Sequence, residues 1–222
     1  MTRSIRIVKI GGNVVNNPDA LASFLADFVK LPGQKILVHG GGREATRLSA
    51  ALGIETTMIN GRRVTDRETL DVVTMVYAGL VNKRIVAALQ ALGCDAIGLS
   101  GADADVIRAT RRPATPVDFG YVGDIDDEDV AESVLAMLLR NGLTPVFCAI
   151  THDRQGQLLN CNADSVAAAV ACAASRIHPA SLIYCFEKPG VLSDADDDNS
   201  VISLITPENY ASLRESGAVS GG

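Results

Sequence analysis

Two strand–glycine–helix units near the start of the chain restrict the fold more than any other feature. In one of them, the apolar run Ile36–Val38 leads into His39-Gly40-Gly41-Gly42-Arg43, and residues 44–52 have the composition of a helix. Such a turn directs backbone N–H groups and a helix N-terminus towards an anion. It matches neither G-x-G-x-x-G nor G-x-x-x-x-G-K-[ST]. The sequence predicts an anion-binding turn at 39–43, with a plain connecting turn as the alternative.

The other unit lies at the N-terminus. Ser4–Ile10 has a strand pattern and ends on Gly11-Gly12, and Asn17-Pro18 is typical of a helix start, with asparagine as the N-cap. Consecutive units of this kind imply parallel strands joined by crossover helices. We predict an α/β fold, namely a three-layer α/β/α sandwich with a mainly parallel central sheet and β-hairpin insertions.

The rest of the chain continues this pattern. A short strand near 56–59 and a polar loop over 60–65 come first. Helices are predicted over 66–92, 127–141, 162–174 and 206–216, and strands over 95–100, 144–150 and 181–186. Residues 101–126 and the turn at 153–156 instead have the alternation and turn residues of hairpins.

Composition excludes some partners. The net charge is −6, aromatic residues make up 4% and there is no tryptophan. These values argue against nucleic acid, which needs a basic surface or aromatic stacking platforms. A few local cations could still bind an anionic small molecule.

The cysteines and the apolar runs indicate the cellular compartment of the protein. Five cysteines form no C-x-x-C pair, and three histidines lack metal-ligand spacing. The N-terminus has a strand pattern instead of a signal peptide, and Gly, Asp, Arg or Asn interrupts every apolar run before it approaches the length of a membrane span. We predict a cytoplasmic protein with reduced thiols and no membrane contact.

Acidic residues do not form a metal site in the sequence. Asp194–Asn199 resembles the start of a calcium loop but has Asn at its sixth position and Ile205 at its twelfth. Asp103 and Asp105 have no further candidate ligands nearby in the chain. We interpret all of them as loop carboxylates, so no metal ligand is predicted.

Basic residues at two turns are candidates for anion binding. Lys9 precedes Gly11-Gly12 at the carboxyl end of the first strand, where ligands gather in open parallel sheets. Arg62 and Arg63 follow Asn60-Gly61, and a guanidinium can hold a carboxylate through two hydrogen bonds. The alternative interpretation is that Lys9 is an ordinary surface lysine and that Arg62 and Arg63 are solvated.

Asn160-Cys161-Asn162-Ala163-Asp164 precedes the predicted helix over 162–174. Its polar side chains could simply cap that helix. Two amides and a carboxylate on one turn also suit contact with a ligand and orientation of a lysine.

Taken in order, these motifs resemble a known family. Lys9-Ile-Gly-Gly, His39-Gly-Gly-Gly, Asn60-Gly-Arg-Arg-Val-Thr-Asp, Gly120-Tyr-Val-Gly-Asp and Asn160-Cys-Asn-Ala-Asp resemble the motifs of acetylglutamate kinases, which belong to the amino acid kinase superfamily. The resemblance implies ATP-dependent phosphorylation of the side-chain carboxylate of N-acetyl-L-glutamate to an acyl phosphate, a step of arginine biosynthesis. The same motifs would also suit N-succinyl-L-glutamate. A non-catalytic protein that binds acyl-glutamate or nucleotide is the alternative of another class.

The resemblance also implies residue roles. Lys9 would stabilise the phosphoryl group in transit, and Asp164 would orient Lys9 without acting as a base. For the remaining positions, it implies phosphoryl contacts from Gly11 and Gly12, substrate contacts from Gly41 and Gly42, and anchoring of the α-carboxylate by Arg63 and Asn160.

ATP contacts are implied for two further segments, Glu187-Lys188-Pro189-Gly190-Val191-Leu192 and Ala218-Val219-Ser220. The chain departs from the family here, because Phe186-Glu187 replaces a common Ser-Asp pair. Mg²⁺ would arrive with ATP, held mainly by phosphate oxygens and water.

The resemblance implies two lobes. Residues 1–178 would form an N-terminal lobe that binds acyl-glutamate and dimerises, and 179–222 would begin an ATP-binding lobe. Relatives continue after Ser-Gly-Gly to a second phosphoryl-stabilising lysine, so we expect the sequence to be incomplete at Gly222. A homodimer is expected.

Overall fold

The computed structural model describes residues 4–186, 188–194, 196–215 and 217. The chain forms two compact units, Met1–Cys185 and Phe186–Gly222. The predicted start of the second lobe at residue 179 precedes a strand, β11, that pairs with β1 in the sheet of the first unit.

The first unit is built on a five-stranded parallel sheet. The strand order is β11-β1-β2-β8-β5, and neighbouring strands run in the same direction throughout. The bounds are β1 Ile5–Ile10, β2 Gln34–His39, β5 Ala96–Leu99, β8 Thr144–Cys148 and β11 Ala180–Cys185.

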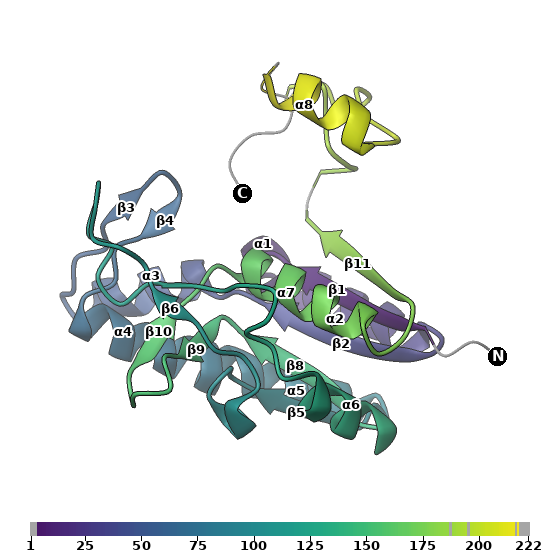
Figure 1. Cartoon of the computed structure of the whole chain (residues 1–222), viewed down its shortest axis with the longest axis horizontal. Coiled ribbons are helices and arrows are strands. Elements are labelled where there is room, and N and C mark those ends of the chain that lie inside the picture. The colour runs from purple at the N-terminus through teal and green to yellow at the C-terminus, as the bar shows by residue number, and fades with distance from the viewer. Residues whose placement is uncertain (1–3, 187, 195, 216, 218–222) are drawn as a thin grey trace. The chain divides into compact units, whose positions relative to one another are not determined.

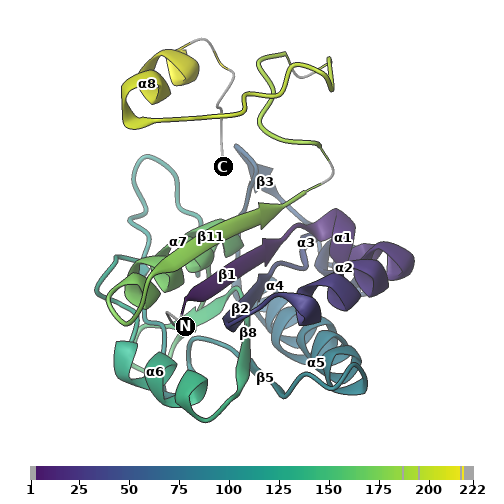
Figure 2. The same cartoon turned by 90° about the vertical axis from the view of Figure 1, so that its right-hand side faces the viewer.

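Helices cover both faces of this sheet, which confirms the predicted α/β/α sandwich. Figure 2 shows α6 and α7 on one side of the sheet and α2, α3, α4 and α5 on the other. The helix bounds are α1 Gly12–Asn16, α2 Pro18–Lys30, α3 Gly42–Ala51, α4 Arg67–Thr74, α5 Asn82–Ala91, α6 Glu132–Arg140 and α7 Ala163–Ser175.

Alternation along β1 decides which side chain faces which layer. Ile5 and Ile7 are fully buried in the core under α7, whereas Val8 and Ile10 belong to the core under α2 and α5. Successive strand residues point to opposite faces. Lys9 therefore lies on the α7 face.

Asn17 caps α2 as predicted. Its side-chain oxygen accepts hydrogen bonds from the backbone N–H groups of Asp19 and Ala20, both at 3.1 Å, and Pro18 occupies the first helical position. The short helix α1, between β1 and this cap, was not predicted, since its five residues are too few for a periodic pattern.

The long helix predicted over 66–92 is confirmed, with one irregularity. Asp66 caps it by accepting from the Thr69 N–H at 2.8 Å, and a π-helical segment, Met75–Val81, separates α4 from α5. Arg67–Ala91 is long and apolar enough to cross a membrane by length and composition alone, and Asp71, Gly79 and Asn82 interrupt its apolar residues as expected. In the fold it is a core helix, and Leu70, Val73 and Ile85 are buried.

Three hairpins project from the sandwich, in the regions 56–65, 101–126 and 150–160. They pair β3 Met58–Ile59 with β4 Arg62–Arg63, β6 Thr110–Arg111 with β7 Gly123–Asp124, and β9 Ile150–His152 with β10 Leu158–Asn160. Figure 1 shows β3–β4 and β9–β10 at the same end of the first unit.

Several predicted boundaries are wrong. The polar loop over 60–65 contains a strand, because Asn60 and Gly61, with φ of 49° and 75°, form a two-residue hairpin turn. The predicted strand over 144–150 is two strands that belong to different sheets. Helix α6 begins at Glu132 instead of residue 127, after a loop in which the Asp126 N–H donates to the Asp129 carboxylate.

The second unit contains helix α8, Pro207–Glu215. The Thr206 hydroxyl accepts from the Asn209 N–H at 3.4 Å, as the predicted helix start requires. Leu192 pairs with Val201 in an isolated bridge, and Leu192 is 9% exposed.

Candidate active site

The structure brings Lys9 and Asp164 together. Lys9 extends from β1 on the face that α7 covers, and Asp164 lies in the first turn of α7. Lys9 Nζ is 2.8 Å from Asp164 Oδ1, with the two side chains 17% and 36% exposed. The ammonium group is therefore held at the carboxyl end of β1 and remains accessible, as the predicted orienting role of Asp164 requires.

The two asparagines of the segment Asn160–Asp164 have different contacts in the fold. Asn162 is the N-cap of α7, and its side chain accepts from the Asp164 N–H at 2.7 Å. Asn160 ends β10 and is buried, and its Nδ2 donates to Thr65 Oγ1 at 3.0 Å. The capping alternative therefore holds for Asn162. Asn160 instead joins the segment after β4 to the β9–β10 hairpin.

Arg63 is a buried cation. It lies on β4, is 7% exposed, and Nη2 donates to Gly42 O at 2.9 Å and to Thr46 Oγ1 at 2.8 Å. Nη1 donates to Thr56 Oγ1 at 3.2 Å. These acceptors are all neutral, and within the described part of the chain no carboxylate forms an ion pair with Arg63. The guanidinium joins hairpin β3–β4 to the glycine turn.

The glycine turn at 39–43 contacts Arg63 and Tyr77. Gly41 is the N-cap residue of α3 and Gly42 is its first residue. Gly41 has a φ of 174°, which any residue can adopt, but a Cβ there would lie 2.7 Å from Tyr77 Cδ1. The position therefore requires glycine for space, and the turn keeps its backbone next to Arg63.

Gly11 and Gly12 follow Lys9 at the end of β1. The Gly11 N–H donates to Cys185 O at 3.2 Å and so continues the pairing of β1 with β11. Within α1, the Val15 N–H donates to Gly11 O. The first amides of this helix, beginning with Gly12, precede that bond and are the ones that a helix leaves without an internal partner.

His39 does not belong to this cluster, although it begins the glycine turn. It is fully buried on the α5 side of the sheet, with Nδ1 2.7 Å from Gly40 O and Nε2 3.1 Å from Asn82 Nδ2. Burial lowers the pKa of His39 to about 4, and the Gly40 carbonyl opposes this shift only in part. The ring is a neutral core group.

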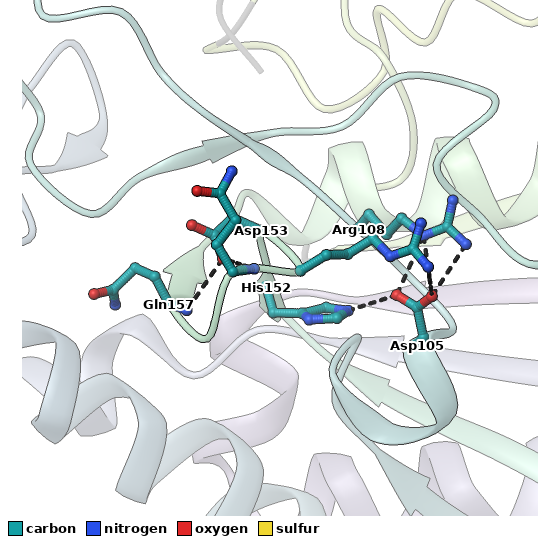
Figure 3. Close-up of polar contacts among 7 residues, drawn as sticks. Asp105, Arg108, His152, Asp153 and Gln157 are labelled. Carbon is teal, nitrogen blue, oxygen red and sulfur yellow. Dashed lines mark hydrogen bonds and ion pairs between the residues drawn. The ribbon is translucent and has the colours of Figure 1, made fainter.

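Asp103 and Asp105 are loop carboxylates with protein partners. Asp103 accepts from the Ser100 N–H at 2.7 Å. Asp105 is paired with Arg108 at 3.1 Å and lies 3.0 Å from His152 Nε2, as Figure 3 shows. Hydrogen bonding from Arg108 lowers the pKa of Asp105. This cluster joins the 101–126 insertion to β9, and among the described residues it has no member in common with the Lys9 or Arg63 contacts.

The predicted nucleotide segments fall in the second unit. Lys188 forms a 2.7 Å ion pair with Asp198, and Val191 O accepts from the Ile202 N–H at 2.8 Å. A Cβ on Gly190 would lie 2.8 Å from Val201 Cγ1. Pro189 and Leu192 belong to the same loop. The predictions for Glu187, Ala218, Val219 and Ser220 lie outside the described residues.

Sequence reasoning missed Tyr77, Thr46 and Thr65 as neighbours of the candidate site. Thr46 and Thr65 are ordinary helix and loop residues in the sequence, and no pattern distinguishes them. Tyr77 carries a phenol inside a mostly apolar stretch, and a buried phenol needs a polar partner. That signal could have identified it.

Comparison with known proteins identifies the family. The model of the amino acid kinase family matches residues 4–222. An acetylglutamate kinase of Phocaeicola vulgatus is 53% identical over 222 residues, which are 100% of this chain and 86% of the relative. One of Bacteroides thetaiotaomicron is 50% identical over the same length and coverage.

A solved structure agrees with this assignment. The crystal structure of smu.665 from Streptococcus mutans UA159 superposes with a TM-score of 0.79 at 26% identity, covering 98% of this chain and 85% of that one. The parallel sheet, the order of the motifs and these matches lead to one conclusion. The chain belongs to the amino acid kinase family.

Proposed function

We propose that this chain catalyses ATP-dependent phosphorylation of the side-chain carboxylate of N-acetyl-L-glutamate to an acyl phosphate, a step of arginine biosynthesis. Full-length similarity to relatives named acetylglutamate kinase supports the proposal. It favours the acetyl compound over N-succinyl-L-glutamate, and a phosphotransferase over a non-catalytic binding protein.

The observation that carries this proposal is the buried guanidinium of Arg63. A buried charge is costly unless an opposite charge pairs with it. The described groups around Arg63 are two threonine hydroxyls, a backbone carbonyl and the neutral phenol of Tyr77, which supply no negative charge. The α-carboxylate of an acyl-glutamate would supply it through strong, charge-assisted hydrogen bonds. Asn160 would add an amide contact, and Gly41 and Gly42 would leave backbone room for the ligand.

The chemistry needs no general base. The attacking side-chain carboxylate is ionised at neutral pH, so catalysis reduces to positioning and to stabilising the charge on the transferring phosphoryl group. Lys9 would supply a positive charge at that group, and Asp164 would hold the Lys9 ammonium at 2.8 Å. Gly11 and Gly12 would place backbone next to the phosphoryl oxygens.

ATP and Mg²⁺ belong to the same proposal. The segment containing Glu187, Lys188, Pro189, Gly190, Val191 and Leu192, together with Ala218, Val219 and Ser220, would contact ATP. Across the described residues, no three His, Cys, Asp or Glu side chains gather to hold a metal ion. In this proposal, Mg²⁺ would enter as the MgATP co-substrate, held mainly by phosphate oxygens and water.

The proposal also includes the setting in which the enzyme works. We propose a cytoplasmic homodimer that dimerises through its N-terminal lobe. Size-exclusion chromatography with light scattering would test the dimer, and a monomeric mass at assay concentrations would contradict it.

Kinetics with two substrates test the function. ADP release should be supported by N-acetyl-L-glutamate in preference to N-succinyl-L-glutamate. A strong preference for the succinyl compound would overturn the choice of acyl group. Retained ligand binding without any turnover would favour the non-catalytic alternative.

Two substitutions separate the residue roles. Lys9→Ala should lower kcat by about 10²- to 10³-fold, as the loss of a transition-state donor does, with a smaller effect on acyl-glutamate binding. Arg63→Ala should first raise KM for acyl-glutamate, by roughly 10- to 100-fold. Lys30→Ala is the matched control for Lys9→Ala, since Lys30 is a surface residue paired with Asp27. Arg62→Ala is the control for Arg63→Ala at the neighbouring position of the same hairpin. A Lys9→Ala variant close to wild type would refute the phosphoryl site.

A further inference from the structure

Tyr77 is a buried polar residue that no assigned role explains. It is 6% exposed and lies in the π-helical segment Met75–Val81 of the long core helix. Such segments are rare inside helices and occur often at functional sites. Tyr77 lies at the junction of the two structures that the proposed function assigns to the substrate, namely the glycine turn and Arg63.

The tyrosine ring supports the glycine turn. A Cβ on Gly41 would lie 2.7 Å from Tyr77 Cδ1 and 3.0 Å from Cε1, so the ring packs directly on the Gly41 backbone. Val81, one helical turn further, also borders this point, with Cγ2 at 3.6 Å. The ring therefore determines how deeply the turn can settle into the core.

The hydroxyl of Tyr77 lies on the opposite side, beside Arg63. A Cβ on Gly42 would lie 3.9 Å from both Tyr77 Oη and Arg63 Nη2, so the phenol and the guanidinium border the same backbone position. Arg63 also donates to Gly42 O at 2.9 Å. One side chain thus packs on the turn and lies next to the arginine that donates to it.

The chemistry of the phenol suits a supporting role. Burial raises the pKa of Tyr77, and the charge and hydrogen bond of Arg63 oppose that shift only in part. The phenol is therefore neutral at physiological pH, so it can accept a hydrogen bond from Arg63 without neutralising it. The positive charge of Arg63 stays available for an anion.

We propose that Tyr77 is a positioning residue for the acyl-glutamate site, fixing the Arg63 guanidinium relative to the Gly41-Gly42 backbone. The inference rests on the proposed function. It adds a specific consequence: the hydroxyl of Tyr77 acts on substrate affinity through Arg63, and its ring acts through Gly41. Neither part of the side chain contacts the transferring phosphoryl group.

Tyr77→Phe tests the hydroxyl, because it removes one oxygen and keeps the ring. At saturating ATP, KM for N-acetyl-L-glutamate should rise roughly 5- to 10-fold, the equivalent of one ordinary hydrogen bond, while kcat changes less than about twofold. KM for ATP should not change. Tyr210→Phe makes the same change at an exposed tyrosine, which is 46% exposed, and is the matched control.

A binding measurement keeps the test independent of turnover. N-acetyl-L-glutamate should raise the melting temperature of the wild-type chain more than that of Tyr77→Phe at the same ligand concentration, because tighter binding stabilises more. Equal ligand-induced shifts in the two proteins would overturn the proposal.

Double-mutant cycles identify the two contacts. Combining Tyr77→Phe with Arg63→Lys should raise KM by less than the product of the single effects, since the two changes remove the same contact. Tyr77→Leu should likewise relieve part of the stability loss of Gly41→Ala, because the ring that the new Cβ meets is gone. Additive effects in both cycles would refute the positioning role.

The outcomes separate this inference from the proposed function. If Arg63→Ala raises KM but Tyr77→Phe does not, the role of Tyr77 is wrong and the function stands. If Arg63→Ala leaves KM unchanged, the proposed substrate anchor itself is wrong.

Discussion

Acidification should destabilise the fold through His39. The Gly40 carbonyl can only accept a hydrogen bond, so Nδ1, at 2.7 Å, carries the ring proton. Nε2 then accepts from Asn82 Nδ2 at 3.1 Å, and the same amide group donates to Val146 O at 2.9 Å. Both ring nitrogens are satisfied in the neutral form. A proton on Nε2 would face the Asn82 donor inside the core.

The size of the effect follows from the pKa. Burial is the main cause that lowers the pKa of His39 from 6.5 to about 4, with a small contribution from the charge of Lys83. Between these values the unfolded chain binds a proton that the folded chain does not, so stability falls as pH falls. At pH 5 the loss from this residue is about 2 kcal/mol, and across the whole window it is roughly 3 kcal/mol. Well above pH 6.5 the residue contributes no pH dependence.

Chemical denaturation at pH 7 and pH 5 measures this contribution. His39→Asn cannot titrate and keeps an N–H donor near Gly40. Its free energy of unfolding should therefore fall by about 2 kcal/mol less than that of the wild type between the two pH values. His178→Asn removes a histidine that is only partly buried and is the matched control. Equal pH dependence in His39→Asn and the wild type would refute the reasoning.

Three further predictions concern packing, capping and the metal. Gly41→Ala should lower the free energy of unfolding by about 1–3 kcal/mol, because the new methyl group overpacks against Tyr77. Urea titration measures this loss, and an unchanged midpoint would contradict the close contact. Asp66→Ala should cost about 1 kcal/mol by removing the cap on the Thr69 N–H, whereas Asp71→Ala, exposed on the same helix, should cost much less. EDTA should abolish ADP release and added Mg²⁺ should restore it, while binding of N-acetyl-L-glutamate, followed by calorimetry, stays unchanged. Activity that survives chelation would argue against MgATP as the co-substrate.

Local signals in the sequence were enough for most elements. Asn17 with Pro18 marks a helix start that depends on neighbouring residues alone, and the helix predicted from residue 66 does begin at a capping residue, Asp66. The apolar pattern of residues 4–10 was enough to predict a strand, and the structure showed that it is buried on both faces. The boundaries that failed depend on distant contacts or on very short elements. The division between β8 and β9 follows from pairing with different strands, and α1 has only five residues.

For the candidate site, too, the residues could be predicted from the sequence but their contacts could not. The motifs identified Lys9, Arg63, Asn160 and Asp164, and the resemblance implied a role for each. The 2.8 Å pairing of Lys9 with Asp164 joins residues far apart in the chain, and it exists because β1 presents Lys9 to the face that α7 covers. No local pattern encodes that distance.

The βα units, the helix starts, the order of the motifs and the family could be predicted from the chain alone, because each depends on residues close together in the chain or on their order. Which side of the sheet each polar residue faces became clear only from the packed fold. His39, predicted as part of an anion-binding turn, faces the core, whereas Lys9 meets Asp164 at the candidate site. The packed fold also shows that Arg63 is buried among neutral acceptors and that Tyr77 packs on Gly41. The physical reason is that burial and pairing arise only when distant segments pack together.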